Sequence, residues 1–207
     1  MLAELEAKQK ALAAEQDRLN KLKKDLEASS ARLAELEKMM ADKDAAMKKL
    51  KETLTKSLKA FEGKGLTVTE KDGKVYVSME NKLLFESGSW TVGSEGKKAV
   101  DLVGKVLGDN PEISVLIEGH TDNDKITGTI GGGVENNWDL STKRATAIVN
   151  ILSANAKVKK ENLTAAGRGE FAPLMSNDTA EGKAKNRRIE IILTPKLDEI
   201  SKMLNEL

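Results

Sequence analysis

Two short segments combine charged and apolar residues in a pattern that could bind a ligand. The apolar residues Ile113, Val115, Leu116 and Ile117 are followed by the polar segment 119–122, which predicts the end of a buried strand. Further along, Asn137 precedes apolar residues at helical spacing, so we expect Asn137 to cap a helix. At about 100° per residue, Arg144 falls on the apolar arc of that helix. An arginine there is costly unless an anion pairs with its guanidinium group.

Two interpretations account for Arg144. In the first, it forms an internal ion pair with Asp122, which follows the neighbouring strand. In the second, the two charges stay apart, so that Asp122 takes an ammonium group and Arg144 takes a carboxylate through paired hydrogen bonds. The N-terminus of the Asn137 helix adds partial positive charge on the anion side. The second interpretation describes a receptor for a zwitterion, such as the head group of an amino acid.

Several motifs occur in a fixed order along the chain. They are Thr121-Asp122, then Asn137-x-x-Leu140-Ser141-x-x-Arg144-Ala145, then Asn186-Arg187-Arg188-Ile189-Glu190-Ile191, with supporting segments at 84–89 and 166–170. With these motifs the chain resembles OmpA-like (OmpA/MotB) peptidoglycan-binding domains over about residues 66–193. The loop 125–135, which contains Gly131-Gly132-Gly133, is longer than the family's usual connection, so the resemblance is weakest at the mouth of the expected pocket.

The resemblance implies a function and a set of ligand-binding residues. Asp122 and Arg144 would hold the diaminopimelate of the peptidoglycan stem peptide, Arg188 would support Arg144 on the carboxylate side, and Thr121 and Asn137 would line the same cleft. The protein would be a non-catalytic anchor that attaches an envelope or membrane protein to the cell wall. As the alternative, it would be a MotB-like stator component that couples an ion-driven membrane motor to the wall.

Composition narrows the possible partners and compartments. The 207 residues contain 34 Lys and Arg against 33 Asp and Glu, and only 3% aromatic residues, which disfavours nucleic-acid binding. Cysteine is absent, so disulfides and thiolate metal sites are excluded. No apolar run reaches the roughly 20 residues that span a bilayer, and the first residues lack signal-peptide features. We therefore expect an export signal or membrane anchor upstream, and a location in the periplasm or cell envelope of a Gram-negative bacterium, associated with the outer membrane.

Residues 1–62 are predicted to form one long helix, because they contain neither glycine nor proline and are rich in Ala, Leu, Glu and Lys. Apolar residues repeat every seven positions: Leu5, Leu12, Leu19, Leu26, Leu33, Met40, Met47, Leu54 and Phe61. This repeat favours a coiled coil, in which a parallel homodimer would bury the seam. The alternative is an isolated spacer helix stabilised by ion pairs along its surface.

Residues 63–195 are predicted to form the compact domain, of α+β class. Strands are expected at 66–69, 75–78, 113–117, 163–167 and 188–193, with helices at 93–107 and 137–152. Asp72-Gly73 predicts the turn of a hairpin. The order of elements favours a two-layer α/β sandwich, with a mixed sheet and helices on one face. A last helix is expected at Pro195–Leu207, with Thr194 as its cap.

Other kinds of site are less well supported. His120, Asp122 and Asp124 alternate like a metal-binding trio, but the chain has no second histidine. Ser141 could be drawn into a hydrolase triad, yet no serine lies in a nucleophile-elbow sequence. Gly131-Gly132-Gly133 is not followed by the Lys and Ser/Thr of a phosphate-binding loop. We therefore expect no metal, no cofactor and no catalytic residues.

Overall fold

The structure, a computed structural model, describes residues 1–86, 89–127 and 131–197. The chain divides into two compact units. The first is Met1–Lys43 together with Leu197–Leu207, of which only Leu197 is described, and the second is Asp44–Lys196. Among the described residues, no helix combines the length and the apolar character needed to cross a membrane.

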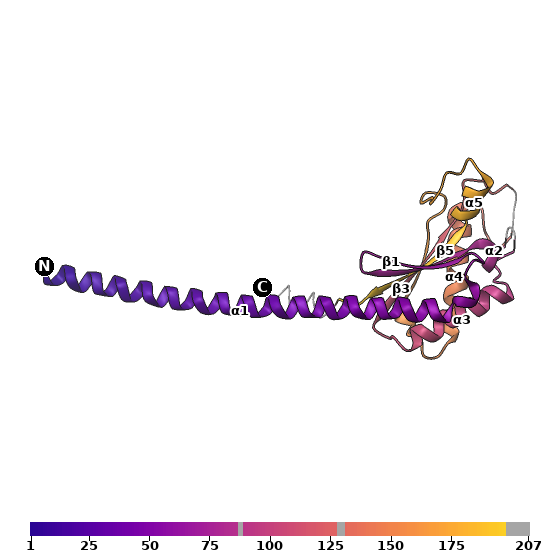
Figure 1. Ribbon diagram of the computed structural model, residues 1–207. Coiled ribbons are helices and arrows are strands. Elements are labelled where there is room, and N and C mark those ends of the chain that lie inside the picture. Colours follow the sequence, from indigo (N-terminus) through magenta and orange to yellow (C-terminus); the bar gives the residue numbers. More distant parts are fainter. Residues whose placement is uncertain (87–88, 128–130, 198–207) are drawn as a thin grey trace. The chain divides into compact units, whose positions relative to one another are not determined.

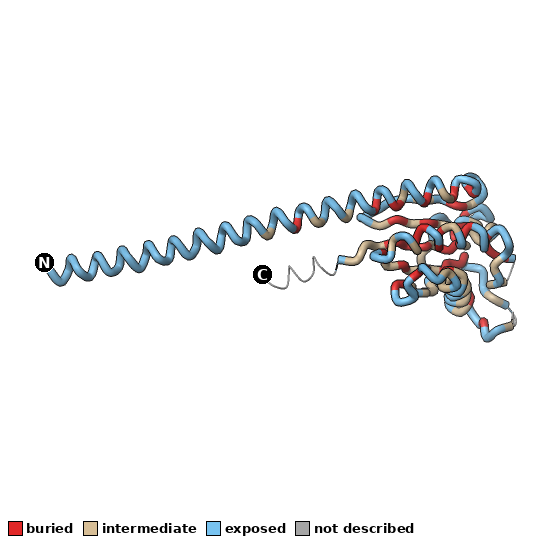
Figure 2. The backbone as a smooth tube through the Cα atoms, turned by 90° about the horizontal axis from the view of Figure 1, so that it is seen from below, coloured by how far each residue is buried: buried red, intermediate tan, exposed pale blue. Residues whose placement is uncertain are grey.

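Helix α1 spans Leu2–Ser57, as the composition predicts. Its residues in the first unit are mostly exposed, and Figure 2 shows this part of the helix almost entirely in the colour of exposed residues. The large apolar side chains exposed there are Leu2, Leu5, Leu12, Leu19, Leu22, Leu26, Leu33 and Met40. Within this unit, the predicted seam therefore presents apolar surface to solvent.

The later part of the same heptad repeat behaves differently. Met47, Leu54 and Phe61 are buried in the hydrophobic core of the second unit, together with Leu50 and Leu58. The 3₁₀ helix η1 (Lys59–Phe61) continues this contact after α1 ends. The compact domain was predicted to begin at residue 63, whereas the second compact unit begins at Asp44 and includes this part of α1. One heptad stripe thus has two different environments.

The second unit is built on one mixed sheet (Figure 1) with strand order β1-β2-β5-β3-β4. The strands are β1 (Leu66–Lys71), β2 (Lys74–Glu80), β3 (Ile113–His120), β4 (Leu163–Gly167) and β5 (Arg188–Pro195). Strands β3 and β4 are parallel, and all other neighbours are antiparallel. The predicted turn joins β1 to β2, with positive φ at Asp72 (52°) and Gly73 (67°), as a tight hairpin turn requires.

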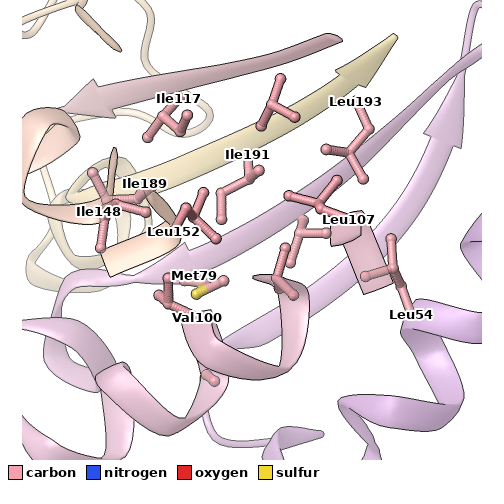
Figure 3. Packing of buried hydrophobic residues seen from close by; sticks show 14 of the residues in the cluster. Leu54, Met79, Val100, Leu107, Ile117, Ile148, Leu152, Ile189, Ile191 and Leu193 are labelled. Carbon is pink, nitrogen blue, oxygen red and sulfur yellow. The ribbon is translucent and has the colours of Figure 1, made fainter. Parts of the chain in front are cut away.

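Helices cover one face of this sheet and form the second layer. The helices with residues in the core are α2 (Asn81–Leu84), α3 (Ser94–Gly108) and α4 (Asn137–Ala154), together with the last part of α1. The 3₁₀ turn η2 (Lys160–Asn162) and the short α5 (Ala180–Asn186) contribute no residue to that core. Figure 3 shows side chains of α3 and α4, such as Leu107 and Leu152, packed against alternate residues of β5, such as Ile191. The predicted α+β sandwich with a long preceding helix is confirmed, whereas α5 was not predicted.

The end of β5 corrects one prediction. The strand continues through Pro195, and the Lys196 amide donates a hydrogen bond to the Glu112 carbonyl at 3.1 Å. Thr194 and Pro195 therefore end a strand and do not begin a helix. The rest of the predicted last helix, residues 198–207, lies outside the described residues.

We expect Leu54→Ala to lower the free energy of unfolding of the second unit by about 2–5 kcal/mol, because Leu54 is fully buried and truncation leaves a cavity. The measurement is urea unfolding followed by the fluorescence of Trp90 and Trp138, which both lie in this unit. Leu26→Ala, on the same stripe but exposed, is the control and should change the value by less than about 0.5 kcal/mol. Equal effects of the two variants would contradict the packing described here.

Candidate functional site

A cavity of about 670 Å³ lies where β3 ends and α4 begins. Its lining residues are Asn81, Lys82, Phe85, Thr121, Asp122, Asp124, Lys125, Ile126, Asn137, Leu140, Arg144, Ala184 and Arg187. Thr121, Asp122, Asn137 and Arg144, four of the five predicted site residues, are among them. The loop after β3, the first turns of α4 and the end of α5 therefore meet at this cavity.

Two glycines allow α4 to approach the sheet closely enough to build the cavity wall. A Cβ atom on Gly119 of β3 would lie 2.0 Å from the Ser141 carbonyl oxygen, and one on Gly167 of β4 would lie 2.1 Å from the Thr142 hydroxyl oxygen. Any other residue would force the helix away from the strands. The Ser141 hydroxyl adds a second link, because it accepts a hydrogen bond from the Gly169 amide at 3.1 Å.

The start of α4 differs from the prediction by one residue. Asn136 is the cap, since its side chain accepts a hydrogen bond from the Asp139 amide at 3.1 Å. Asn137 is the first helical residue. Its side-chain nitrogen Nδ2 lies within hydrogen-bonding distance of the Asp122 carbonyl (3.3 Å), the Asp124 carbonyl (3.1 Å) and the Glu170 carboxylate (2.6 Å). Asn137 thus joins α4 to the loop that carries Asp122.

Arg144 is buried with only 4% of its surface exposed, on the arc of α4 that the sequence predicts. Its Nε donates to the Ser89 carbonyl at 3.0 Å, and its guanidinium group lies 5.2 Å from the centre of the Phe85 ring. Among the described residues, no acceptor is found for its two terminal nitrogens. Burial and the nearby Arg187 lower the pKa of Arg144 to about 10, while Asp122 acts in the opposite direction. Arg144 therefore remains charged at neutral pH.

Asp122 has a partner that the sequence analysis did not assign to it. Its carboxylate pairs with Arg187, and it also lies 3.3 Å from the Asp124 amide. Within the described part of the chain, Asp122 and Arg144 form no ion pair with each other, so the first interpretation of Arg144 fails. The side chain of Arg187 is 37% exposed, which leaves it free to move. Asp122 and Arg144 form no pair, as the second interpretation requires, but Asp122 is paired with a second arginine, Arg187.

The structure does not bring Arg188 together with the other predicted site residues, because Arg187 and not Arg188 lines the cavity. Arg188 begins β5 on the sheet face opposite the core, and its Nε pairs with Glu190 at 2.8 Å. Its remaining nitrogens donate to the carbonyls of Asn186 and Ala172, both at 3.2 Å. Arg187 is the residue that follows α5, a helix the sequence analysis missed, and this helix end directs it into the cavity.

Thr121 lies beside Asp122 and is almost fully buried. Its amide donates to the Gly169 carbonyl at 2.9 Å, which fixes the backbone at this point. Its hydroxyl oxygen has no hydrogen-bond partner among the described residues. A buried hydroxyl without a partner at the wall of a cavity is available to a guest.

A smaller cavity of about 310 Å³ adjoins the first and shares Lys125, Ile126 and Asn137 with it. Trp138 and Phe171 line this second cavity and stack on each other, with ring centres 5.2 Å apart. Both rings are exposed, by 50% and 65% of their surface. Trp138 thus walls a cavity beside the one that contains Arg144.

The residues considered from the sequence for a metal trio and for a hydrolase triad are engaged in other contacts. In the trio His120, Asp122 and Asp124, both carboxylates already have a cationic partner. Asp122 is paired with Arg187, and Asp124 is paired with Lys183 at 2.6 Å. The Ser141 hydroxyl donates to the Trp138 carbonyl at 3.0 Å and accepts from the Gly169 amide, which leaves it engaged with the backbone.

Known proteins are similar to this chain in sequence and in fold. The sequence profile of the OmpA family matches residues 84–187. Motility protein B of Bacillus subtilis (strain 168) is 34% identical over 120 residues, which are 58% of this chain and 45% of that protein. The chain spans about half the length of the first curated relatives it matches, 45% and 57%.

Two solved structures share the fold. The structure of a putative MotB-like protein from Desulfovibrio vulgaris has a TM-score of 0.69 and 20% identity, and the match covers 76% of this chain and 99% of that one. The cell wall anchor of the T6SS from Pseudomonas aeruginosa has a TM-score of 0.61 and 28% identity, with 69% and 97% covered.

We expect Gly119→Ala to lower the free energy of unfolding by about 1–3 kcal/mol or more, because the new methyl group collides with the backbone of α4. Gly104→Ala on α3 is the matched control. Its Cβ would lie 3.5 Å from its nearest neighbour, Leu152, which is an ordinary van der Waals distance. The free energy of unfolding should therefore stay the same or rise by up to about 1 kcal/mol. Urea unfolding followed by tryptophan fluorescence measures both. Tolerance of Gly119→Ala would contradict the proposed role of this close contact.

Proposed function

Because the chain belongs to the OmpA family, we propose that its second unit binds peptidoglycan without catalysing a reaction and anchors an envelope protein to the cell wall. The observation that carries this proposal is the buried Arg144, whose terminal nitrogens have no acceptor among the described residues and which lines a large cavity beside Asp122. The similar T6SS cell wall anchor supports it. The corresponding location is the periplasm or cell envelope, with outer-membrane association as the narrower expectation.

The proposed ligand group is the diaminopimelate of the stem peptide. Its free carboxylate pairs with Arg144, whose planar guanidinium offers two parallel donors. Its ammonium pairs with Asp122, and the Thr121 hydroxyl completes the contacts. The volume of about 670 Å³ lies in the range of pockets that enclose small ligands.

Arg187 modifies this picture, because the ammonium must share or replace its contact with Asp122. Arg187 itself lines the cavity, where it adds a second cation to Arg144. The cavity wall then carries more positive than negative charge, since Lys82 and Lys125 also line it. A stem peptide with several carboxylates fits such a wall better than a neutral peptide does. We expect weak affinity for a single site, on the order of micromolar to millimolar, because few groups are desolvated.

The first test compares two ligands that differ by one carboxylate. A stem peptide with diaminopimelate and one with lysine share the side-chain ammonium, but the lysine peptide lacks the carboxylate proposed for Arg144. Calorimetric titration should show tighter binding of the diaminopimelate peptide. Arg144→Gln should weaken that binding at least about tenfold and remove the preference, since a charge-assisted hydrogen bond contributes about 1.5–3 kcal/mol.

Two further variants complete this test. Asp122→Asn should weaken binding of both peptides, because both carry the ammonium. Arg18→Gln, an exposed arginine of α1, is the control and should leave both affinities unchanged. Equal affinity of wild type and Arg144→Gln for the diaminopimelate peptide would refute the proposed role of Arg144.

The similarity to motility protein B of Bacillus subtilis favours a second candidate function, a stator component that couples an ion-driven membrane motor to the wall. Both functions use the same wall-binding domain. The sequence of the gene upstream of Met1 and the motility of a deletion strain distinguish them. A transmembrane helix upstream together with lost swimming supports the stator, whereas a lipid-anchor signal and normal swimming support the anchor.

We further propose that the first unit forms a parallel homodimeric coiled coil through its exposed heptad stripe. Two domains on one dimer would raise the avidity for the wall without any new contact.

In analytical ultracentrifugation the intact chain should sediment as a dimer. Replacing Leu12, Leu19 and Leu26 by lysine should give a monomer, because three charges enter the seam. The control replaces the exposed Lys23 by alanine and should remain a dimer. A monomeric wild type would contradict the proposal.

A further inference from the structure

Three ionisable side chains gather on the sheet face opposite the helices. Glu118 and His120 belong to β3, and Glu190 belongs to β5. They occupy strand positions that alternate with buried core residues such as Ile117 and Ile191, so they point away from the core. None of the three lines the cavity that contains Arg144. This cluster is therefore separate from the site already described.

The register of the sheet places like charges opposite each other. Glu118 and Glu190 are direct partners in the antiparallel pairing of β3 with β5. Two carboxylates in this position repel each other and destabilise the pairing unless cations compensate. Their side chains are 17% and 16% exposed, so the repulsion is only partly screened by water.

His120 adds a second anomaly. It is only 2% exposed, and neither of its ring nitrogens has a hydrogen-bond partner among the residues that the structure describes. Its Nε2 nevertheless lies 3.5 Å from a carboxylate oxygen of Glu118 and 3.9 Å from one of Glu190. His120 thus brings a buried imidazole nitrogen, the commonest metal ligand in proteins, next to two carboxylates.

We propose that Glu118, His120 and Glu190 bind a divalent transition-metal ion, with zinc as the best-fitting member of this class. Their three ligand atoms all lie within 4.8 Å of one another. Around a tetrahedral zinc ion at about 2.1 Å, ligand atoms are separated by roughly 3.4 Å. A small rotation of the two partly exposed carboxylates reaches that spacing. Water would take the fourth position, and the ion would satisfy Nε2 of the histidine.

The surroundings of Glu190 support this arrangement. Arg188 pairs with the Oε1 atom of Glu190 at 2.8 Å, while the Oε2 atom is the one that faces His120. Arg188 is itself held by backbone carbonyls of Asn186 and Ala172. Carboxylates that bind metals are commonly oriented in this way by a hydrogen bond to their other oxygen. Arg188 thus acts as a positioning residue.

Arg168 opposes the metal ion. Its Nε lies 3.9 Å from the same Glu118 oxygen that faces His120, so it competes for this ligand atom. Its side chain is 52% exposed and can turn into solvent at little cost. The proposal therefore predicts effects of opposite sign, since removing a ligand weakens metal binding whereas removing Arg168 strengthens it.

The choice of metal follows from the ligands. An imidazole nitrogen suits zinc and its neighbours in the first transition row, whereas magnesium and calcium prefer sites made only of oxygen atoms. Cysteine is absent and His120 is the single histidine of the chain, so few other residues compete for zinc when the protein carries no histidine tag.

The test is calorimetric titration of the tag-free, full-length chain with zinc chloride, with magnesium chloride as the comparison. We expect saturable binding of one zinc ion per chain and none of magnesium. Glu118→Gln and Glu190→Gln should each weaken zinc binding at least tenfold, and Arg168→Gln should tighten it. Glu161→Gln, an exposed carboxylate elsewhere, is the control. Cobalt(II) as a second probe should give visible absorption in wild type that His120→Asn abolishes.

Circular dichroism checks that each variant is folded. If His120→Asn unfolds, Glu118→Gln and Glu190→Gln still test the proposal. The melting temperature of wild type should rise with zinc and stay constant with magnesium. Absence of saturable zinc binding by wild type would overturn the proposal. Equal binding by Glu118→Gln and wild type, or weaker binding by Arg168→Gln, would overturn it too.

Discussion

The close approach of α4 to β3 and β4 determines the other features of the cavity. Without side chains at Gly119 and Gly167, the helix backbone rests directly on the two strands. This contact carries Arg144 into a buried position, where a carbonyl group and an aromatic ring are its neighbours and no carboxylate pairs with it among the described residues. Burying a cation in this way is costly. The fold bears this cost at the position where an anionic guest would offset it.

Much of this arrangement could be predicted from the sequence because it follows from local periodicity. The strands show apolar alternation, and the arc of α4 repeats at helical spacing, so Arg144 stands out as a charge among apolar residues. The polar end of β3 identifies Asp122 in the same way. The Asp72-Gly73 turn has a strong local signature. The resemblance of the motifs to the OmpA family predicted that the end of β3 and the start of α4 lie at the same cleft.

The remaining features depend on contacts between distant segments. Asn136 and Asn137 can both cap a helix, and only the loop after β3 decides between them. Arg187 and Arg188 are adjacent, and the choice depends on α5, whose sequence lacks apolar periodicity. The heptad repeat did not reveal that its early residues are exposed while its later residues pack into the core of the second unit. Core packing and a coiled-coil seam require the same spacing of apolar residues. The metal trio considered from the sequence was His120, Asp122 and Asp124, and the lack of a second histidine argued against it. That Glu190 lies beside Glu118 and His120 depends on the pairing of β3 with β5, and this register is not visible in the sequence.

The pairing of Asp122 with Arg187 has a thermodynamic consequence. Any cationic group that reaches Asp122 exchanges places with a guanidinium attached to the same chain, so association there is an ion exchange rather than the formation of a new pair. Added salt screens the outgoing contact as well as the incoming one. The tethered arginine also returns as soon as the guest leaves, because it never diffuses away. Such an exchange favours rapid release of a cationic group from Asp122 and makes this one contact depend little on ionic strength.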